Sequence, residues 1–239
     1  MKERLFRFKQ FCVSHAVSAM KVGVDAVMLG AWADIEGVKK VVDVGCGCGV
    51  IALIVAQRAP DSKILAIDVD SDAVMEAKDN FQRSPWKERV KAKTISFDEL
   101  IKEGKKFDML ISNPPFYDSG VNSNLDSRMK ARHFGELSPV SLVRNASQIL
   151  SEEGRLALIC PSDLESKLLS EGDLHGLCAV RITSVKTTPE KAPKRILLEF
   201  CRKENKIDNC IKDTITIQQS AGVYTEEYIN LTRDYYINF

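Results

Sequence analysis

The residues Ser112-Asn113-Pro114-Pro115-Phe116 follow an apolar run, Met109 to Ile111, that is typical of a buried parallel strand. Two consecutive prolines fix φ twice and remove two backbone donors, so the turn is stiff and its carbonyl groups face outward. Asn113 adds a side-chain acceptor on one side of the turn, and Phe116 adds a flat apolar ring on the other. This stretch, called the clamp below, has the composition needed to hold a planar amide or amine.

Such a clamp suits the methylation of an exocyclic amine, whose nitrogen is a poor nucleophile because its lone pair is delocalised into the ring. If the Asn113 side-chain oxygen and the Pro114 carbonyl accept the two amine hydrogens, the nitrogen can become tetrahedral and direct its lone pair at an electrophile. Phe116 can stack on the ring, as enzymes that act on an extruded base require. The alternative is a proline-rich turn in which Asn113 is a turn residue and Phe116 packs on the core.

A glycine-rich loop lies upstream, where a strand predicted over Lys40–Val44 runs into Asp43-Val-Gly45-Cys46-Gly47-Cys-Gly49 before a helix at Val50–Arg58. Glycines at three alternating positions let the backbone turn tightly and lie against a ligand. The spacing does not satisfy G-x-G-x-x-G because position 50 is valine, so a dehydrogenase fits poorly. The loop therefore predicts that the protein binds a nucleotide-like cofactor, and its spacing does not indicate a dinucleotide.

The next strands end in further candidate cofactor residues. The strand predicted over Lys63–Ile67 ends at Asp68, where a carboxylate can accept hydrogen bonds from two ribose hydroxyls, and Asp70 is expected to cap the following helix. After the strand at Val90–Thr94, Ser96 could hydrogen-bond the amino group of an adenine and Phe97 could cover its ring. Asp98 is expected to cap the helix that follows. Asp25 is expected to be the N-cap of a helix that starts at Ala26. The stretch from Lys21 to Asp25 is expected to form one wall of the cofactor pocket. The predicted cofactor-binding residues are Lys21, Asp43, Gly45, Cys46, Gly47, Gly49, Asp68, Val69, Ser96, Phe97 and Asn113.

The composition limits the class of protein. The 34 basic and 33 acidic residues nearly cancel, so any contact with nucleic acid must come from local patches. One such patch is expected in the polar stretch 118–136, where Arg128, Lys130 and Arg132 could grip phosphates, although a solvated loop explains the stretch equally well. The seven cysteines form no C-x-x-C pair and resemble reduced core thiols. We therefore predict a cytoplasmic protein with no metal and no membrane segment, and we expect it to be a monomer.

Strands and helices alternate along the chain, which predicts an α/β fold with a parallel sheet and helices on both faces. The connection between the last two long strands, residues 186–194, is too short for a helical crossover, so the last strand is expected to be antiparallel. The prediction is a seven-stranded Rossmann-like sheet, with a small edge strand near Thr214–Gln218. We expect one domain over residues 1–239, with 1–24 as an N-terminal extension and 204–239 as a C-terminal extension.

The glycine loop from Asp43 to Gly49, Asp68 and the Asn113-Pro-Pro-Phe turn together resemble the class I S-adenosylmethionine-dependent methyltransferases that methylate amino groups. The similarity extends to the bacterial tRNA1(Val) adenine-N6 methyltransferases, which modify the adenine 3′ to the anticodon. Segments that carry it include FKQFCVSHAVSAMKVGVDAVMLGAWA at 8–33, residues 194–200 and residues 224–239. The resemblance implies that S-adenosylmethionine is the cofactor, tRNA is the partner, and Asn113, Pro114, Pro115 and Phe116 hold the target amine.

Two positions depart from the family pattern. The family usually has Asp where Ser96 stands and commonly has Tyr where Phe116 stands. Guanine-modifying ribosomal RNA methyltransferases with Asn-Pro-Pro-Phe resemble the clamp equally well. Guanine N2 methylation, methylation of a protein glutamine amide, and a non-catalytic RNA-binding module with a methyltransferase-like fold therefore remain alternatives at this point.

Overall fold

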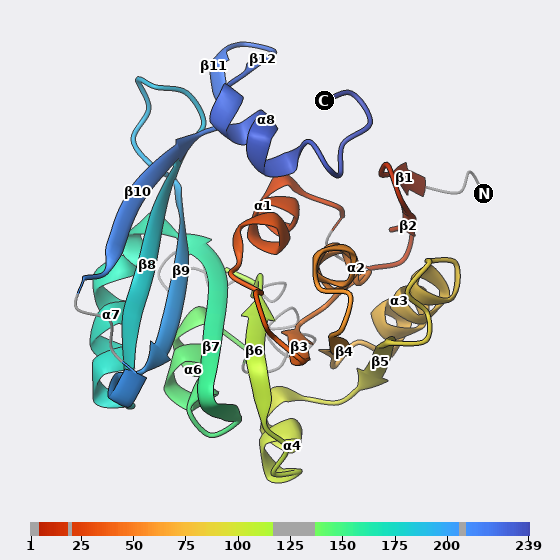
Figure 1. Ribbon diagram of the computed structural model, residues 1–239, viewed down its shortest axis with the longest axis vertical. Helices are drawn as coiled ribbons and strands as arrows, with labels where there is room; N and C mark the ends of the chain where they lie inside the picture. Colours follow the sequence, from red (N-terminus) through yellow and green to blue (C-terminus); the bar gives the residue numbers. More distant parts are fainter. Residues whose placement is uncertain (1–4, 19–20, 117–136, 206–208) are drawn as a thin grey trace, which may run out of the picture.

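The computed structural model describes residues 5–18, 21–116, 137–205 and 209–239, and its centre is an eight-stranded sheet (Figure 1). The strand order is β10-β8-β9-β7-β6-β3-β4-β5. The strands are β3 (Lys40–Val44), β4 (Lys63–Asp68), β5 (Val90–Thr94), β6 (Phe107–Ser112), β7 (Leu150–Pro161), β8 (Leu177–Lys186), β9 (Arg195–Arg202) and β10 (Ile211–Thr216).

The directions of the strands confirm the predicted sheet and add one strand to it. β3, β4, β5, β6 and β7 pair in parallel, whereas β9 runs antiparallel to both of its neighbours, β7 and β8. The expected edge strand is β10, which pairs in parallel with β8 from Ile211 to Thr216 and so joins the main sheet. Residues of the predicted C-terminal extension thus contribute the eighth strand.

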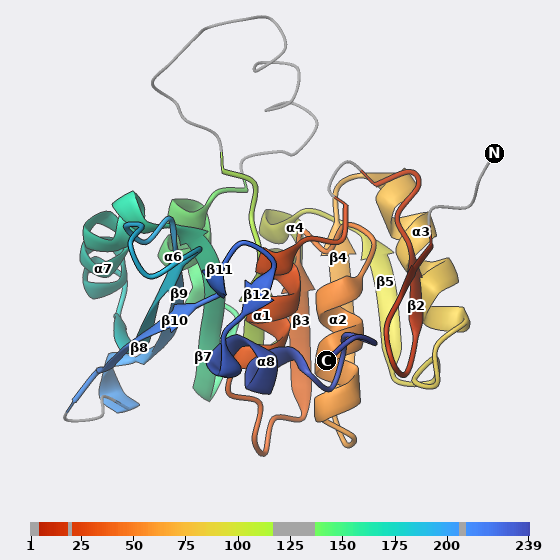
Figure 2. The same cartoon turned by 90° about the horizontal axis from the view of Figure 1, so that it is seen from above.

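Helices cover both faces of the sheet, with α1, α2 and α3 on one side and α4, α6 and α7 on the other (Figures 1 and 2). Successive strand residues point to opposite faces, so Val41 and Met109 join the core under α1 and α2, whereas Val42 and Leu110 join the core under α6. This burial on both sides explains why these strands are apolar throughout. The helices are α1 (Val24–Trp32), α2 (Val50–Arg58), α3 (Ser71–Gln82), α4 (Phe97–Lys102), α6 (Pro139–Ala146), α7 (Glu165–Leu174) and α8 (Glu226–Thr232).

The helix starts confirm one predicted cap and correct two. Asp70 caps α3, since its side chain accepts from the N–H groups of Asp72 and Ala73. Asp25 does not cap α1: the cap is Gly23, and Asp25 is the second helical residue. Asp98 does not cap α4 either, because Ser96 forms a reciprocal capping box with Glu99. Both errors shift a cap by two residues, which sequence alone resolves poorly.

The two ends of the chain pack against each other beside α1 and α2. The hairpin of β1 (Leu5–Arg7) and β2 (Cys12–Ser14) meets the C-terminal residues through a bridge between Phe8 and Tyr236. The Lys9 ammonium donates to the carbonyl oxygens of Arg233 at 2.6 Å and Phe239 at 2.8 Å. A second small hairpin, β11 (Gln218–Ser220) with β12 (Val223–Tyr224), precedes α8. Within the described ranges, no helix is both long and apolar enough to cross a bilayer.

Candidate functional site

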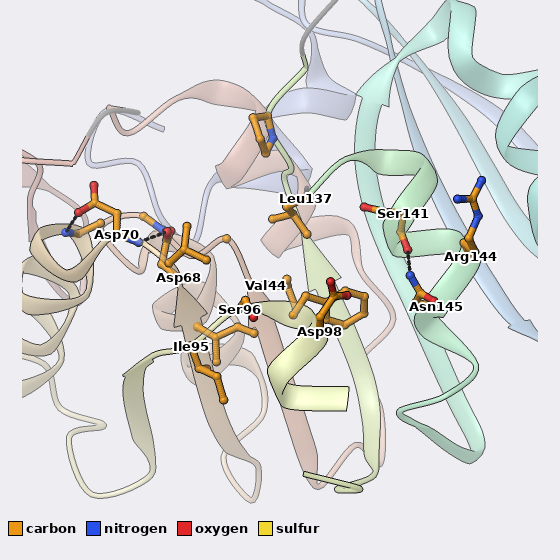
Figure 3. A pocket seen from close by; sticks show the side chains of 17 residues that line it. Val44, Asp68, Asp70, Ile95, Ser96, Asp98, Leu137, Ser141, Arg144 and Asn145 are labelled. Atoms are coloured by element: carbon orange, nitrogen blue, oxygen red, sulfur yellow. Dashed lines mark hydrogen bonds between the residues drawn. The ribbon is translucent and has the colours of Figure 1, made fainter. Parts of the chain in front are cut away.

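A cavity opens at the carboxyl ends of β3, β4, β5 and β6, where the winding of the sheet reverses. Ligands bind at this position in open parallel sheets. Asp68 and Asp70 border one side, and Ser141, Arg144 and Asn145 of α6 border the other (Figure 3). The predicted site residues that line the cavity are Gly45, Gly47, Asp68, Val69, Ser96, Phe97 and Pro115.

The three loop glycines all have positive φ, but they differ in what surrounds them. Gly47 has φ +52°, and a Cβ added there would meet nothing within 4 Å, so its surface toward the cavity is open. Gly49 has φ +80°, and a Cβ there would lie 2.5 Å from the Phe81 ring. Gly49 therefore makes room for α3 and does not line the cavity. The expected contact of Gly49 with the cofactor stays a prediction. In the structure, position 49 lies against the Phe81 ring.

Asp43 and Asp68 place two carboxyl groups beside the glycine loop. Asp43 is fully buried, and its Oδ2 accepts from the Ala52 N–H at 3.1 Å. Burial, with a smaller contribution from the charge of Asp68, raises the pKa of Asp43 to about 7. Asp68 accepts from the Gly47 N–H at 2.9 Å and from the Asp70 N–H at 3.1 Å. Burial also raises the pKa of Asp68, and these bonds hold its carboxylate at the cavity edge.

Ser96 and Phe97 lie at the cavity side formed after β5. The Ser96 hydroxyl donates to Glu99 Oε2 at 2.8 Å and accepts from the Glu99 N–H at 3.2 Å. Its hydrogen-bonding capacity is thus largely used in capping α4. Phe97 is 7% exposed and packs into the core on the α6 side, so it forms part of the apolar floor.

The clamp is tied to the glycine loop by a hydrogen bond between their strands. The hydroxyl of Ser112, which is fully buried, donates to the Val44 carbonyl at 2.6 Å. The next residue, Asn113, has a buried side-chain oxygen Oδ1 with no hydrogen-bond partner among the described residues. Buried acceptors are almost always paired, so an unpaired one calls for an explanation. Pro115 lines the same cavity as Gly45 and Gly47, whereas the other clamp residues, Asn113, Pro114 and Phe116, are not among its lining residues.

Some predicted residues lie elsewhere. Lys21 does not line the cavity, and its ammonium donates to the His15 carbonyl at 2.8 Å and the Ala16 carbonyl at 3.3 Å. Cys46 is buried in the core, where desolvation raises its thiol pKa. The predicted RNA-contacting residues Arg128, Lys130 and Arg132 lie outside the described residues.

Several cavity residues were not anticipated from the sequence. Leu137 and the α6 residues enter the lining because α6 follows the clamp strand and starts at the same edge of the sheet. Arg144 is held by Glu171 of α7 at 2.6 Å, and Asn145 donates to the Ser141 carbonyl at 3.1 Å. The available signal was the order of the chain, because the helix at Pro139–Ala146 is the predicted helix after the clamp strand and before the next strand of the parallel sheet.

The residues in the described ranges include no group of three or more His, Cys, Asp or Glu side chains placed to hold a metal ion. All seven cysteines are free thiols, and Cys46, Cys48, Cys160 and Cys201 are buried. The cavity therefore offers carboxylates, backbone N–H groups and apolar walls to a ligand.

Comparison with known proteins identifies the relatives of this chain. Residues 26–180 match the family model described as "Methyltransferase small domain". The tRNA1(Val) (adenine(37)-N6)-methyltransferase of Bacteroides thetaiotaomicron is 37% identical over 240 residues, covering 100% of this chain and 99% of the relative. The protein of the same name from Trichodesmium erythraeum is 37% identical over 237 residues, covering 98% of each chain.

Solved structures share the fold at low identity. A predicted O-methyltransferase from Agrobacterium tumefaciens has a TM-score of 0.62 and 17% identity, covering 88% of this chain and 96% of its own. TYW2 of P. horikoshii, in complex with MeSAdo, has a TM-score of 0.57 and 12% identity. The match covers 83% of this chain and 71% of the TYW2 chain. At such identities the likeness supports the fold and leaves the substrate to other evidence.

Proposed function

We propose that this chain, which belongs to the methyltransferase small domain family, transfers a methyl group from S-adenosylmethionine to N6 of an adenine in tRNA. The relatives that match along the whole chain carry the name tRNA1(Val) (adenine(37)-N6)-methyltransferase. That name favours adenine 37 of tRNA1(Val) over the guanine and glutamine alternatives. An enzyme of this kind needs a cofactor cavity and an amine-binding group at one edge of the sheet, and the cavity and the unpaired Asn113 Oδ1 at that edge support the proposal.

The cavity fits the cofactor on the evidence of its own residues. The open space beside Gly47 accepts a ligand close to the backbone, and the Asp68 carboxylate is fixed where ribose hydroxyls can donate to it. Gly45, Gly47, Asp68, Val69 and Phe97 are the residues we assign to cofactor binding, and Ser96 lines the same cavity while its hydroxyl caps α4. When bound there, S-adenosylmethionine supplies an electrophilic methyl group on a sulfonium.

The observation that carries the proposal is the unpaired Oδ1 of Asn113. An amine that donates to this oxygen satisfies a buried acceptor and is at the same time oriented for attack. The hydrogen bond favours a tetrahedral nitrogen, whose lone pair is less delocalised into the base and more available toward the cavity. Proximity and orientation of this kind can contribute on the order of 7–11 kcal/mol at best. Asn113 is thus the residue we expect to raise the turnover number.

Phe116 and the basic stretch complete the proposed substrate site. We expect the partly buried Phe116 ring, three residues after Asn113, to stack on the target base. We expect Arg128, Lys130 and Arg132 to contact the phosphates of the RNA, so RNA binding should weaken strongly with salt. We further expect the enzyme to act as a monomer in the cytoplasm.

The direct test is to incubate the protein with S-adenosylmethionine carrying a labelled methyl group and unmodified tRNA, then to identify the nucleoside by mass spectrometry. We expect labelled N6-methyladenosine at position 37 of tRNA1(Val), the position in the relatives' name. Label on guanine would move the substrate to another base, and label on protein alone would overturn RNA as the substrate.

A variant then tests the role of Asn113. We expect Asn113→Ala to lower kcat about 100- to 1000-fold, the usual effect of removing one hydrogen-bonding group that acts in the transition state. The Kd for S-adenosylmethionine, measured by calorimetry, should change less than about twofold because the amide is assigned to the substrate. Asn205→Ala is a matched control, since Asn205 bonds the Glu152 carbonyl away from the cavity. Equal losses of turnover and cofactor affinity in Asn113→Ala would mean that Asn113 is structural.

A further inference from the structure

Arg195 connects the clamp to helix α1. Its guanidinium carbon lies 5.0 Å from the centre of the Phe116 ring. Its Nε donates to Asp25 Oδ2 at 3.0 Å. Asp25 belongs to the first turn of α1, and Arg195 is the first residue of β9. One side chain therefore joins α1, β9 and the end of the clamp.

The strand order explains why an arginine at this position reaches the clamp. β9 runs antiparallel to β7, so β9 begins at the edge where the parallel strands end. Arg195 pairs there with Pro161 of β7 and with Val185 of β8. The clamp leaves the same edge after Ser112. The first residue of an antiparallel strand is thus placed beside the site, which a parallel strand could not achieve.

The chemistry of the contact requires an arginine. A guanidinium group is planar, so it can lay its flat face on an aromatic ring while its edge donates to a carboxylate. The side chains of Arg195 and Asp25 are 35% and 31% exposed, so the pair is partly shielded from water. A lysine carries the same charge but cannot make both contacts in this geometry.

We infer that Arg195 is a positioning residue that holds the Phe116 ring in the orientation for base stacking, and that Asp25 orients the guanidinium. The inference rests on the proposed function, because it assigns Phe116 to the substrate base. Arg195 lies over the ring, which also packs against the core on the α6 side and is only partly buried, so stacking would use the part that stays exposed. The effect of Arg195 on methyl transfer should therefore pass through Phe116.

The test is a double-variant cycle on single-turnover methylation of tRNA. We expect Arg195→Met, which keeps an unbranched apolar chain, to lower the single-turnover rate about tenfold and to leave the Kd for S-adenosylmethionine unchanged. Arg195→Lys should not restore the rate. In a Phe116→Leu background, which has no ring to hold, Arg195→Met should lower the rate less than about twofold further. If the rate losses of the two single variants instead multiply in the double variant, the inference is overturned.

Arg181 provides a matched control within the same chain. Its guanidinium carbon lies 4.5 Å from the Trp32 ring centre, and its Nη2 lies 3.6 Å from Asp213 Oδ2, away from the clamp. Arg181→Met should therefore destabilise the fold comparably, as thermal unfolding measures, while leaving the single-turnover rate within about twofold of wild type. An equal rate loss in Arg181→Met would mean that Arg195 acts only through stability.

Two further readouts distinguish the positioning of Phe116 from direct binding of RNA by Arg195. If Arg195 instead bound an RNA phosphate, Arg195→Met would weaken tRNA binding and reduce its salt dependence in both backgrounds, which would overturn the positioning role. Wild-type activity on tRNA reports on the proposed function independently. Wild-type protein that forms no N6-methyladenosine would refute that function, whereas active wild type with multiplied effects would refute only the role of Arg195.

Discussion

The carboxyl group of Asp68 acts on the fully buried carboxyl group of Asp43, and its charge adds to the effect of burial in raising the Asp43 pKa. The two residues lie toward the carboxyl ends of neighbouring strands, β3 and β4, beside the glycine loop. Asp43 Oδ1 has no hydrogen-bond partner among the described residues, so burial is only partly compensated by the Ala52 N–H. From this combination we expect the stability of the protein to depend on pH through Asp43.

The first prediction follows from the pKa of Asp43, which rises from 3.8 to about 7 on folding. Between these values the native state binds one more proton than the unfolded state, so this contribution to stability is full below pH 3.8 and is lost as the pH rises through about 7. At about 1.4 kcal/mol per pKa unit, the loss amounts to a few kcal/mol.

Urea unfolding of Asp43→Asn and wild type across this range of pH should reveal the difference. The variant cannot ionise, so its free energy of unfolding should rise relative to wild type as the pH increases, while its side-chain oxygen can still accept from the Ala52 N–H. A difference between the two proteins that stays constant with pH would show that the pKa of Asp43 in the native state is not raised above its value in the unfolded state.

The second prediction separates two glycines of the same loop. Gly47→Ala places a Cβ in open space, so its cost should be about 1–2 kcal/mol for the left-handed backbone, together with a large loss of affinity for S-adenosylmethionine. Gly49→Ala places a Cβ against the Phe81 ring and should destabilise the fold more than Gly47→Ala does. Thermal unfolding and calorimetric titration measure the two effects. Greater destabilisation by Gly47→Ala would contradict this assignment.

The sheet could be predicted from the sequence because β3, β4 and β6, at its centre, contain short apolar runs that end in polar or glycine-rich turns. The short connection between β8 and β9 likewise predicted the antiparallel strand. The error at Asp25 has a physical cause: its carboxylate pairs with Arg195, which is 170 residues away. A local pattern cannot distinguish a capping carboxylate from one that pairs with a distant strand.

The same limit applies to the candidate site. Glycine at position 49 indicated a ligand, yet its nearest neighbour is the ring of Phe81 from α3. The lining by Ser141 and Asn145 depends on the angle at which α6 leaves the edge of the sheet, which local spacing does not specify. The sequence indicated the clamp and Asp68 because the expected chemistry needs particular residue types directly at strand ends, and Pro115 and Asp68 do line the cavity.

The third prediction concerns Glu76 of α3, which anchors the segment after β2. Its Oε1 accepts from the Ala16 N–H at 2.6 Å and the Val17 N–H at 3.1 Å, and its Oε2 accepts from the Ser18 N–H at 2.9 Å. Burial acts to raise the pKa of Glu76, but these backbone donors outweigh it and lower the pKa below 4.5. Its contribution to stability is therefore present above pH 4.5 and is lost as the pH falls through the lowered pKa.

We expect Glu76→Gln to lower the free energy of unfolding by about 1.5–3 kcal/mol, the typical value of hydrogen bonds to a charged group. Hydrogen exchange should accelerate at the amides of Ala16, Val17 and Ser18. Asp79→Asn, on the exposed face of the same helix, is the control and should change neither quantity. Protected amides in Glu76→Gln would show that the segment is held by other contacts.

The last prediction tests whether Ser96 serves α4 or the cofactor. Its hydroxyl is shared with Glu99 in the capping box, so Ser96→Ala should lower the free energy of unfolding by about 1 kcal/mol. Ser96→Thr keeps the hydroxyl and should keep most of the stability, since threonine also forms capping boxes. Because Glu99 already occupies the hydroxyl, the Kd for S-adenosylmethionine in Ser96→Ala should change less than about threefold. A tenfold weaker Kd, with Ser96→Thr restored to wild type, would instead place the hydroxyl against the adenine of the cofactor.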